Sequence, residues 1–151
     1  VGSIFVASDN PLIYAKVISS VETRNDSTVI IGSENWLSGD VSYEKFERLH
    51  IILAAPNFTS VSNPNYLDYR RKFIRKHGTF SQDYFSYARI GFEFMMFVGQ
   101  CLNRSGVYFQ QSFGEDKIDG YLYDQFNFHM ARDNQHIPFI FFKRGQLTAL
   151  E

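Results

Sequence analysis

The sequence predicts an α/β protein in three layers, α/β/α, around a mainly parallel sheet, and three observations indicate this class. Short apolar runs typical of buried strands alternate with helix-like segments from the N-terminal end onward. An Asn-Pro pair opens a helical pattern twice, at Asn10 and at Asn63. The last part of the chain has two further β-like runs, which we expect to form a C-terminal β pair. This order predicts helices on both faces of the sheet.

The first half of the chain is predicted to be βαβαβ. SIFVAS (residues 3–8) is typical of a strand buried on both faces, and STVIIG (27–32) and HIILAAPNF (50–58) are the second and third strands. The first helix has Asn10 as its N-cap and Pro11 at its first position, and it continues to about Glu22. A shorter helix is expected in SYEKFERL (42–49). The side chains expected to face the sheet from the first helix are Leu12, Ile13, Val17 and Val21.

The second half begins with two helices. One starts at Asn63 and Pro64 and ends at Gly78, with aromatic residues on one face and a solvated basic face. The other spans about Gln82 to Asn103, and a stripe at steps of three and four predicts core packing of Phe85, Ala88, Phe92, Met95, Gly99 and Leu102. GYLYDQFNFHM (120–130) and HIPFIFFKRGQL (136–147) follow, and we expect them to pair across ARDNQ (131–135).

Composition limits the possible functions. At 151 residues, the chain fits a single α/β domain over residues 1–151. The net charge of −1 provides no basic field, so we expect no nucleic-acid partner. The single cysteine, Cys101, lies in an apolar helical run and is expected to be buried and inert. The sequence has no stretch of the roughly 18 uninterrupted apolar residues that a membrane span requires.

The sequence also lacks the common enzyme motifs. It contains no G-x-S-x-G, P-loop, G-x-G-x-x-G or H-E-x-x-H pattern. His129 and His136 form the nearest histidine pair, but no carboxylate or thiolate stands beside them at zinc spacing. We therefore expect no catalytic residues, no cofactor and no metal site.

Polar or aromatic residues follow each of the three predicted parallel strands. In open α/β sheets, ligands gather outside the carboxyl ends of such strands. This rule selects eight side chains suited to a small polar or zwitterionic ligand, namely Ser8, Asp9, Asn10, Glu34, Asn35, Trp36, Asn57 and Phe58. The alternative is purely structural: the residues after the first strand cap a helix, and Trp36 fills a loop.

Two helical segments carry a resemblance to a known family. NPNYLDYRRKFIRKHG (63–78) and YARIGFEFMMFVGQCLNRSG (87–106) resemble successive helices in the later part of the type I periplasmic solute-binding proteins, the ABC-transporter receptors for leucine, isoleucine, valine and related solutes. Where the family usually has Gly-Tyr-Asp, this chain has Gly91, Phe92 and Glu93. GVYFQQSF (106–113) and residues 120–147 resemble the family's helix-to-tail region. The likeness is diffuse, covers nearly the whole chain and is closest to envelope-associated members from Bacteroidetes-type bacteria.

This resemblance implies a non-enzymatic function, the capture of a small polar, amino-acid-like solute between two lobes of a periplasmic-binding-protein-like I fold. Glu34 matches the acid that receives the ligand ammonium in amino-acid-binding members, and Ser8 and its neighbours match a second contact. The expected location is the periplasm or cell envelope. Because the chain starts at Val1 without an initiator Met or signal peptide, we expect a fragment of a larger two-lobed protein. Its expected partners are the N-terminal part of the same protein, an ABC permease or a second copy.

Two other functions stay open on the sequence alone. One is a cell-envelope interaction or scaffold domain that keeps the fold without a transport ligand. The other is an enzyme with a flavodoxin-like fold, which is the weaker alternative because the sequence shows no nucleophile–base pair and no phosphate loop.

Overall fold

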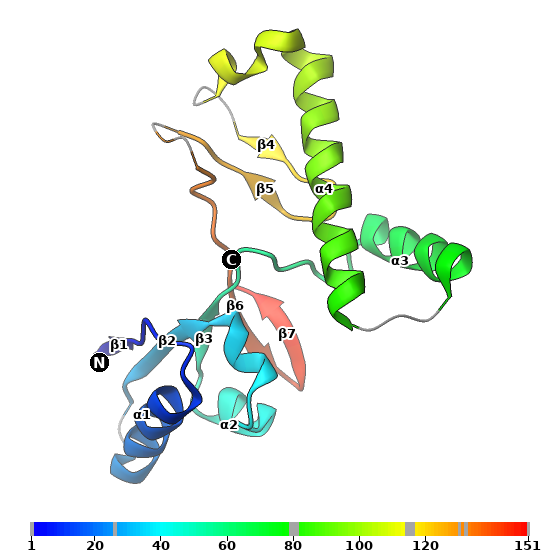
Figure 1. Ribbon diagram of the computed structural model, residues 1–151. Coiled ribbons are helices and arrows are strands. Elements are labelled where there is room, and N and C mark those ends of the chain that lie inside the picture. Colours follow the sequence, from blue (N-terminus) through cyan, green and yellow to red (C-terminus); the bar gives the residue numbers. More distant parts are fainter. Residues whose placement is uncertain are drawn as a thin grey trace. The chain divides into compact units, whose positions relative to one another are not determined.

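The computed structural model describes residues 2–25, 27–78, 82–113, 117–129, 131 and 133–150. The sequence predicts one domain, and the structure gathers the chain into two compact units. The first unit comprises Val1–Pro56 with Ile137–Glu151, and the second comprises Asn57–His136. Figure 1 labels the elements of both units.

The first unit is built on a five-stranded mixed sheet in the order β1-β2-β3-β6-β7. Strands β1 (Ser3–Phe5), β2 (Val29–Ser33) and β3 (Ile52–Ala54) are parallel, as predicted. Strand β6 (Phe139–Lys143) runs antiparallel to β3, and β7 (Gln146–Ala149) runs antiparallel to β6. The tight turn between β6 and β7 uses Arg144 and Gly145, both at positive φ, as two-residue hairpin turns favour. The α/β class is thus confirmed.

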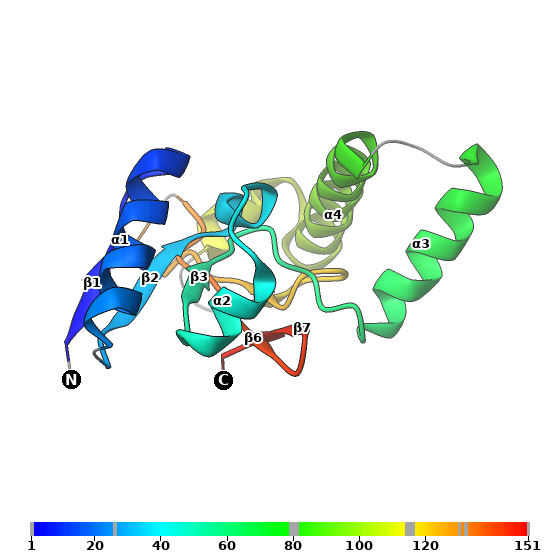
Figure 2. The ribbon, with the colours of Figure 1, turned by 90° about the horizontal axis from the view of Figure 1, so that it is seen from below.

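Both helices of the first unit lie on the same face of the sheet. Helix α1 (Pro11–Arg24) connects β1 to β2, while the 3₁₀ helix η1 (Glu34–Ser38) and helix α2 (Tyr43–Arg48) connect β2 to β3. Crossovers of the same hand between parallel strands in sequential order place their helices on one face, and Figures 1 and 2 show α1 and α2 on the same face of the sheet. The third layer expected from the sequence is not seen among the described residues of this unit.

The core of the first unit forms between the sheet and these helices. Trp36 is completely buried, and its ring stacks on that of Tyr14 with the centroids 4.7 Å apart. A Cβ atom at Gly32 would lie 2.4 Å from the Trp36 ring, so this position in β2 has room only for glycine. Other fully buried side chains are Ile18, Ile30, Phe46, Ile51, Leu53 and Ile140.

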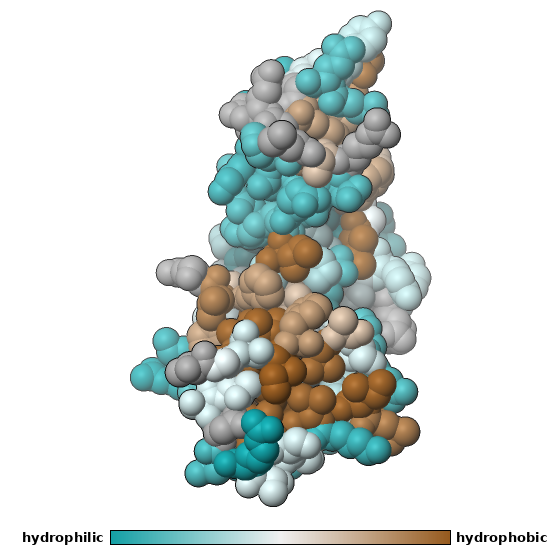
Figure 3. Space-filling model, turned by 90° about the vertical axis from the view of Figure 1, so that its left-hand side faces the viewer, coloured by the Kyte–Doolittle hydropathy of each residue, from teal (hydrophilic) through white to brown (hydrophobic). Residues whose placement is uncertain are grey.

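Two predictions about burial are wrong in this unit. Strand β1 is not buried on both faces: Phe5 is 66% exposed, because β1 is an edge strand and the helices cover one face only. Figure 3, which faces the side of β1, shows hydrophobic side chains gathered over this part of the molecule. Helix α1 buries Tyr14, Ile18 and Val21, so the prediction is confirmed for Val21, while Val17 is half-buried and Leu12 and Ile13 are exposed. The ring of Trp36 fixes this rotation, because it packs on Tyr14.

Ionic contacts join α1 to α2. Glu22 of α1 accepts hydrogen bonds from Lys45, with an Nζ–Oε2 distance of 3.0 Å, and from Arg48. These two cations hold the pKa of Glu22 below its ordinary value. Glu47 accepts from the backbone N–H groups of Arg144 and Gly145, and so links α2 to the β6–β7 turn.

The second unit contains α3 (Pro64–His77), α4 (Gln82–Ser105), the 3₁₀ helix η2 (Gly106–Ser112) and a short antiparallel pair, β4 (Ile118–Asp119) and β5 (Gln125–Phe126). The predicted caps are confirmed: Asn63 accepts from the N–H of Asn65, and Gly78 ends α3 at φ +83°. Aromatic rings join the two helices, with 4.7 Å between the centroids of Tyr69 and Phe92. The predicted basic face of α3 is exposed.

Helix α4 follows the predicted stripe only in its first part, where the half-buried Phe85, Ala88 and Phe92 lie toward α3. The rest of the helix buries a different face. Glu93, Phe97 and Cys101 are buried at spacings of four residues, whereas Met95 is 67% exposed and Gly99 and Leu102 are also exposed. The buried line faces the 121–128 segment, since the rings of Phe97 and Phe126 lie 4.6 Å apart. Cys101 is buried as predicted, and burial raises the pKa of its thiol.

The predicted C-terminal β pair is also corrected. Residues 120–130 and 136–147 do not pair with each other: β5 pairs with β4, and β6 pairs with β3 and β7. The pairing of β6 with β3 is favoured because it places Ile140 opposite Leu53, so that both side chains are buried on the same face of the sheet. The hairpin therefore forms inside the second run, around Arg144 and Gly145.

Candidate functional site

The carboxyl ends of β1 and β2 form one edge of the first unit. The two strands are parallel neighbours, with Phe5 opposite Ile31, and the N–H of Val6 donates to the carbonyl of Ile31 at 2.9 Å. Residues 8–10 and 33–36 therefore leave the sheet at the same edge, as the strand-end rule requires. We refer to these two segments as the strand-end loops.

A side-chain hydrogen bond joins the two strand-end loops. The Asn35 amide Nδ2 donates to Asp9 Oδ2 at 2.9 Å, in an exposed position. The hydroxyl of Ser33 accepts from the backbone N–H of Asn35 at 3.2 Å, so that the turn after β2 is shaped locally. Two predicted site residues from separate segments are thus brought into direct contact.

The buried side chain of Trp36 also links the two strand-end loops. Its indole Nε1 donates to the backbone carbonyl of Ser8 at 2.9 Å, and the side chain has no exposed surface. The ring lies in the core between Tyr14 and Gly32. The structure thus places Trp36 as a support of the strand-end loops, buried away from solvent.

Asn10 and Ser8 are used in shaping helix α1. Asn10 Oδ1 accepts from the N–H of Leu12 at 3.0 Å, and the Ser8 hydroxyl accepts from the N–H of Asn10 at 3.2 Å. This is the capping role that the sequence offered as the structural alternative for these residues. Asp9 lies between them, and its carboxylate is bound by Asn35.

Glu34 is the first residue of η1 and is half-buried. Together with Asp9, it supplies two acidic side chains to the strand-end loops, and neither loop contains a Lys or Arg. These two acids contribute negative charge to the loops, which favours a positively charged ligand group such as an ammonium.

The third predicted group, Asn57 and Phe58, belongs to the second unit. The backbone carbonyl of Asn57 accepts from Arg89 Nη1 at 2.9 Å, and Arg89 also donates to the Thr59 hydroxyl. The guanidinium of Arg89 lies 5.6 Å from the centroid of the Tyr123 ring, a cation–π distance. Of the three predicted groups, the structure brings the first two together.

Glu93 is a buried carboxylate in the second unit. It is 1% exposed and accepts from the backbone N–H groups of Tyr121 and Leu122 at 2.8 and 2.6 Å. Asn63 and Asn65 donate from the start of α3 to the carbonyls of the same two residues. In the sequence, Glu93 was singled out only as part of a family triplet, although an acid within an apolar helix is itself a signal of a buried hydrogen-bonding role.

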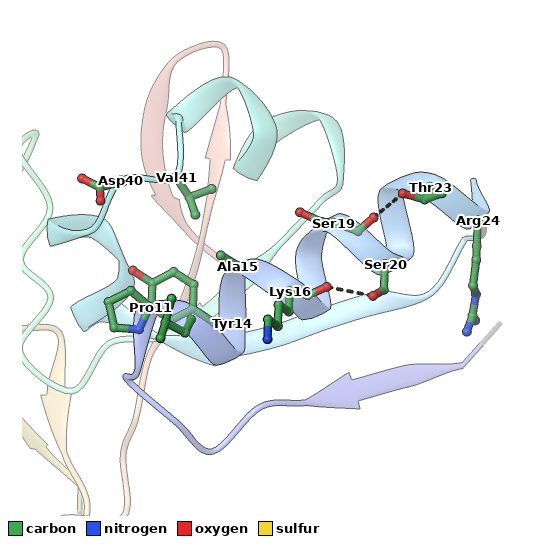
Figure 4. Close-up of a pocket in the computed structure, with 11 residues that line it drawn as sticks. Pro11, Tyr14, Ala15, Lys16, Ser19, Ser20, Thr23, Arg24, Asp40 and Val41 are labelled. Atoms are coloured by element: carbon green, nitrogen blue, oxygen red, sulfur yellow. Dashed lines mark hydrogen bonds between the residues drawn. The ribbon is translucent and has the colours of Figure 1, made fainter.

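A groove of about 780 Å³ runs along α1, between that helix and residues 40–41 (Figure 4). The hydroxyls of Ser20 and Thr23 each donate to a carbonyl one turn back at 2.8 Å, so the helix itself satisfies them. The eight predicted site residues all lie within the described part of the chain, and none of them lines this groove. The groove is thus a separate surface feature.

Comparison with protein-family models, curated proteins and solved structures finds no match to this chain. Among the residues that the structure describes, no group of three or more His, Cys, Asp and Glu side chains could hold a metal ion. Within the same residues, no helix is both long and apolar enough to cross a membrane.

Proposed function

We propose that this chain is part of a type I periplasmic solute-binding protein and that its strand-end loops bind the ammonium group of an amino-acid-like solute. The observation that carries the proposal is the hydrogen bond from Asn35 to Asp9, which joins two loops at the carboxyl ends of adjacent parallel strands. Glu34 is the proposed ammonium acceptor, and Asp9, oriented by Asn35, is the second acid.

The charge of the loops limits what this chain can hold by itself. An amino acid also carries a carboxylate, and the strand-end loops offer it no cationic side chain. The ammonium therefore supplies most of the ionic attraction, and we expect a dissociation constant on the order of 1 mM. In the whole two-lobed protein, loops outside this chain would hold the carboxylate, and closure of the lobes would strengthen binding.

The sheet offers a reason to expect additional polypeptide. Phe5, Ile31, Ile52 and Phe141 share one row across four strands, on the face opposite the helix-facing Phe142. Phe5 in this row is 66% exposed. We propose that the N-terminal part of a longer protein covers this face and completes the three-layer α/β/α fold. Secretion to the periplasm and delivery to an ABC permease belong to the same proposal.

The test is a series of two-dimensional NMR titrations of the chain with leucine, leucinamide and 4-methylpentanoate. Leucinamide keeps the ammonium of leucine and lacks the carboxylate, whereas 4-methylpentanoate keeps the carboxylate and lacks the ammonium. We expect leucine and leucinamide to shift the amide resonances of residues 8–10 and 33–36, and 4-methylpentanoate to leave them in place. Binding of 4-methylpentanoate at these loops, or no response to either ammonium compound, would refute the ammonium site.

A second candidate function is a cell-envelope interaction or scaffold domain. The exposed apolar face of α4 favours it, since Tyr87, Phe94 and Met95 are 75%, 61% and 67% exposed. Sedimentation velocity of the wild type and of Phe94→Ser provides the test. Self-association that Phe94→Ser abolishes would support a second copy as partner, whereas a monomeric wild type would speak against it.

A further inference from the structure

The second unit contains a cavity of about 430 Å³ between α3, α4 and Tyr121, which we call the α3–α4 cavity. Its described lining residues include five aromatic rings, those of Tyr69, Phe73, His77, Phe92 and Tyr121. The Tyr69 and Phe92 centroids are 4.7 Å apart, and the Phe92 and Tyr121 rings meet edge to face at 5.8 Å. Ala88 is the one small side chain among the described lining residues. The volume falls within the roughly 300–1,000 Å³ that small-molecule sites span.

The charged residues at the cavity all come from α3. Lys72 Nζ lies 2.7 Å from Asp68 Oδ2, so these two charges neutralise each other. Lys76 lines the cavity one turn further along, and its side chain is exposed. The helix also carries three exposed arginines, Arg70, Arg71 and Arg75. The cavity therefore combines apolar aromatic walls with a positive rim.

We propose that the α3–α4 cavity binds a planar aromatic anion, with its ring against Tyr69, Phe92 and Tyr121 and its anionic group at Lys76. Aromatic walls favour a flat ring in offset or edge-to-face contact. A carboxylate carried on a short chain from that ring suits the ammonium of Lys76 at the rim. The site lies in the second unit, and its test is independent of the ammonium site proposed for the first.

The environment of Tyr69 agrees with this assignment. Tyr69 is half-buried in the cavity wall, and this burial raises the pKa of its phenol. Lys76 lies at the exposed rim, where its attraction for a carboxylate is modest. The neutral amide of the same ligand lacks this attraction, so the two compounds should differ in affinity.

A purely structural account of the same residues exists. Cations in the last turn of a helix stabilise the negative end of its dipole, and Lys76 and His77 occupy that turn of α3. On that account, Lys76→Gln lowers the stability of the helix and leaves ligand binding unaffected.

The experiment uses NMR titration of the full chain with indole-3-propionate, its neutral amide and the cation tryptamine. We expect indole-3-propionate to bind with a dissociation constant on the order of 1 mM and to shift the amides of residues 69, 88 and 92. Lys76→Gln should weaken this binding about threefold, as for a partly exposed ion pair. Arg75→Gln removes an equal charge from a residue outside the cavity lining and should leave binding unchanged at physiological salt.

Ala88→Phe should abolish binding because it fills the cavity, and Ala88→Leu offers a smaller fill with less risk to folding. Spectral dispersion of each variant verifies that it is folded. The proposal is overturned if indole-3-propionate gives no saturable shifts at the cavity up to about 10 mM. Equal binding of tryptamine, or equal losses in Lys76→Gln and Arg75→Gln, would also overturn it.

Discussion

The side-chain amide of Asn35 donates a 2.9 Å hydrogen bond to the carboxylate of Asp9, across 26 residues of sequence. This bond ties together the ends of two neighbouring parallel strands, and the buried indole of Trp36 makes a second tie to the carbonyl of Ser8. The carboxylate of Asp9 at the sheet edge is thus held in place by its neighbours. Such preorganisation reduces the entropy lost when a ligand binds.

The packing of Trp36 against Gly32 predicts a strong effect of a single methyl group. Gly32→Ala places a Cβ 2.4 Å from the indole ring, and overpacking of this kind should lower the free energy of unfolding by about 1–3 kcal/mol. Urea unfolding followed by circular dichroism measures the change. Gly2→Ala is the matched control, because a Cβ there meets nothing within 4 Å.

The same contact predicts non-additivity. Trp36→Phe makes room for the new methyl group, so the double variant Gly32→Ala/Trp36→Phe should be less destabilised than the two single changes suggest. If the loss of stability in the double variant equals the sum of the losses in the two single variants, the ring and the methyl group do not compete for space.

We expect substitution of Glu93 to destabilise the second unit locally, around Tyr121 and Leu122. Glu93→Ala leaves the buried N–H groups of Tyr121 and Leu122 without their acceptor and should cost about 3 kcal/mol. Glu93→Gln keeps one acceptor oxygen and should cost less. Hydrogen exchange at residues 121 and 122 should accelerate in both variants, and more strongly in Glu93→Ala.

The control for Glu93 is Glu44→Ala, which removes an exposed acid from α2 and should change stability by less than about 0.5 kcal/mol. Unchanged exchange protection of residues 121 and 122 in Glu93→Ala would contradict the anchoring role of the carboxylate.

Glu22 predicts the pH dependence of the α1–α2 contact. Arg48 and Lys45 lower the pKa of Glu22 below its ordinary value of 4.5. A lowered carboxylate pKa means that the stabilisation is present above that ordinary value and is lost as pH falls through the lowered pKa. The ¹³C carboxyl resonance of Glu22 should therefore titrate below pH 4.5. A titration at the ordinary value or above it would contradict the ion pairs, and Lys45→Gln/Arg48→Gln should restore that value.

Features that depend on interactions between residues close together in the chain were predicted correctly from the sequence. The helix starts at Asn10-Pro11 and Asn63-Pro64 were found correctly, because a side-chain cap and a preset proline φ act within four residues. The end of α3 at Gly78 has the same local origin, in a positive φ. The strand-end rule also selected Asp9 and Asn35, which the structure brings into contact.

The sequence could not reveal features that depend on distant partners. The exposure of Phe5 follows from the edge position of β1, which is set by strand order. The exposure of Met95 follows from the packing of α4 against residues 121–128, because an apolar helix does not by itself tell which face meets the core. The β6–β3 pairing joins segments far apart in the chain, and its register was not visible locally. The sequence offered a packing role for Trp36 only as an alternative, because its burial depends on contact with α1.

The most direct test of the proposed ammonium site is the affinity of leucinamide for the wild type, Glu34→Gln and Glu44→Gln. The two variants lose the same charge, but only Glu34 lies in a strand-end loop. We predict about fivefold weaker binding in Glu34→Gln, equivalent to about 1 kcal/mol, and unchanged binding in Glu44→Gln. Equal affinities in all three proteins would contradict the assignment of Glu34 as the ammonium acceptor.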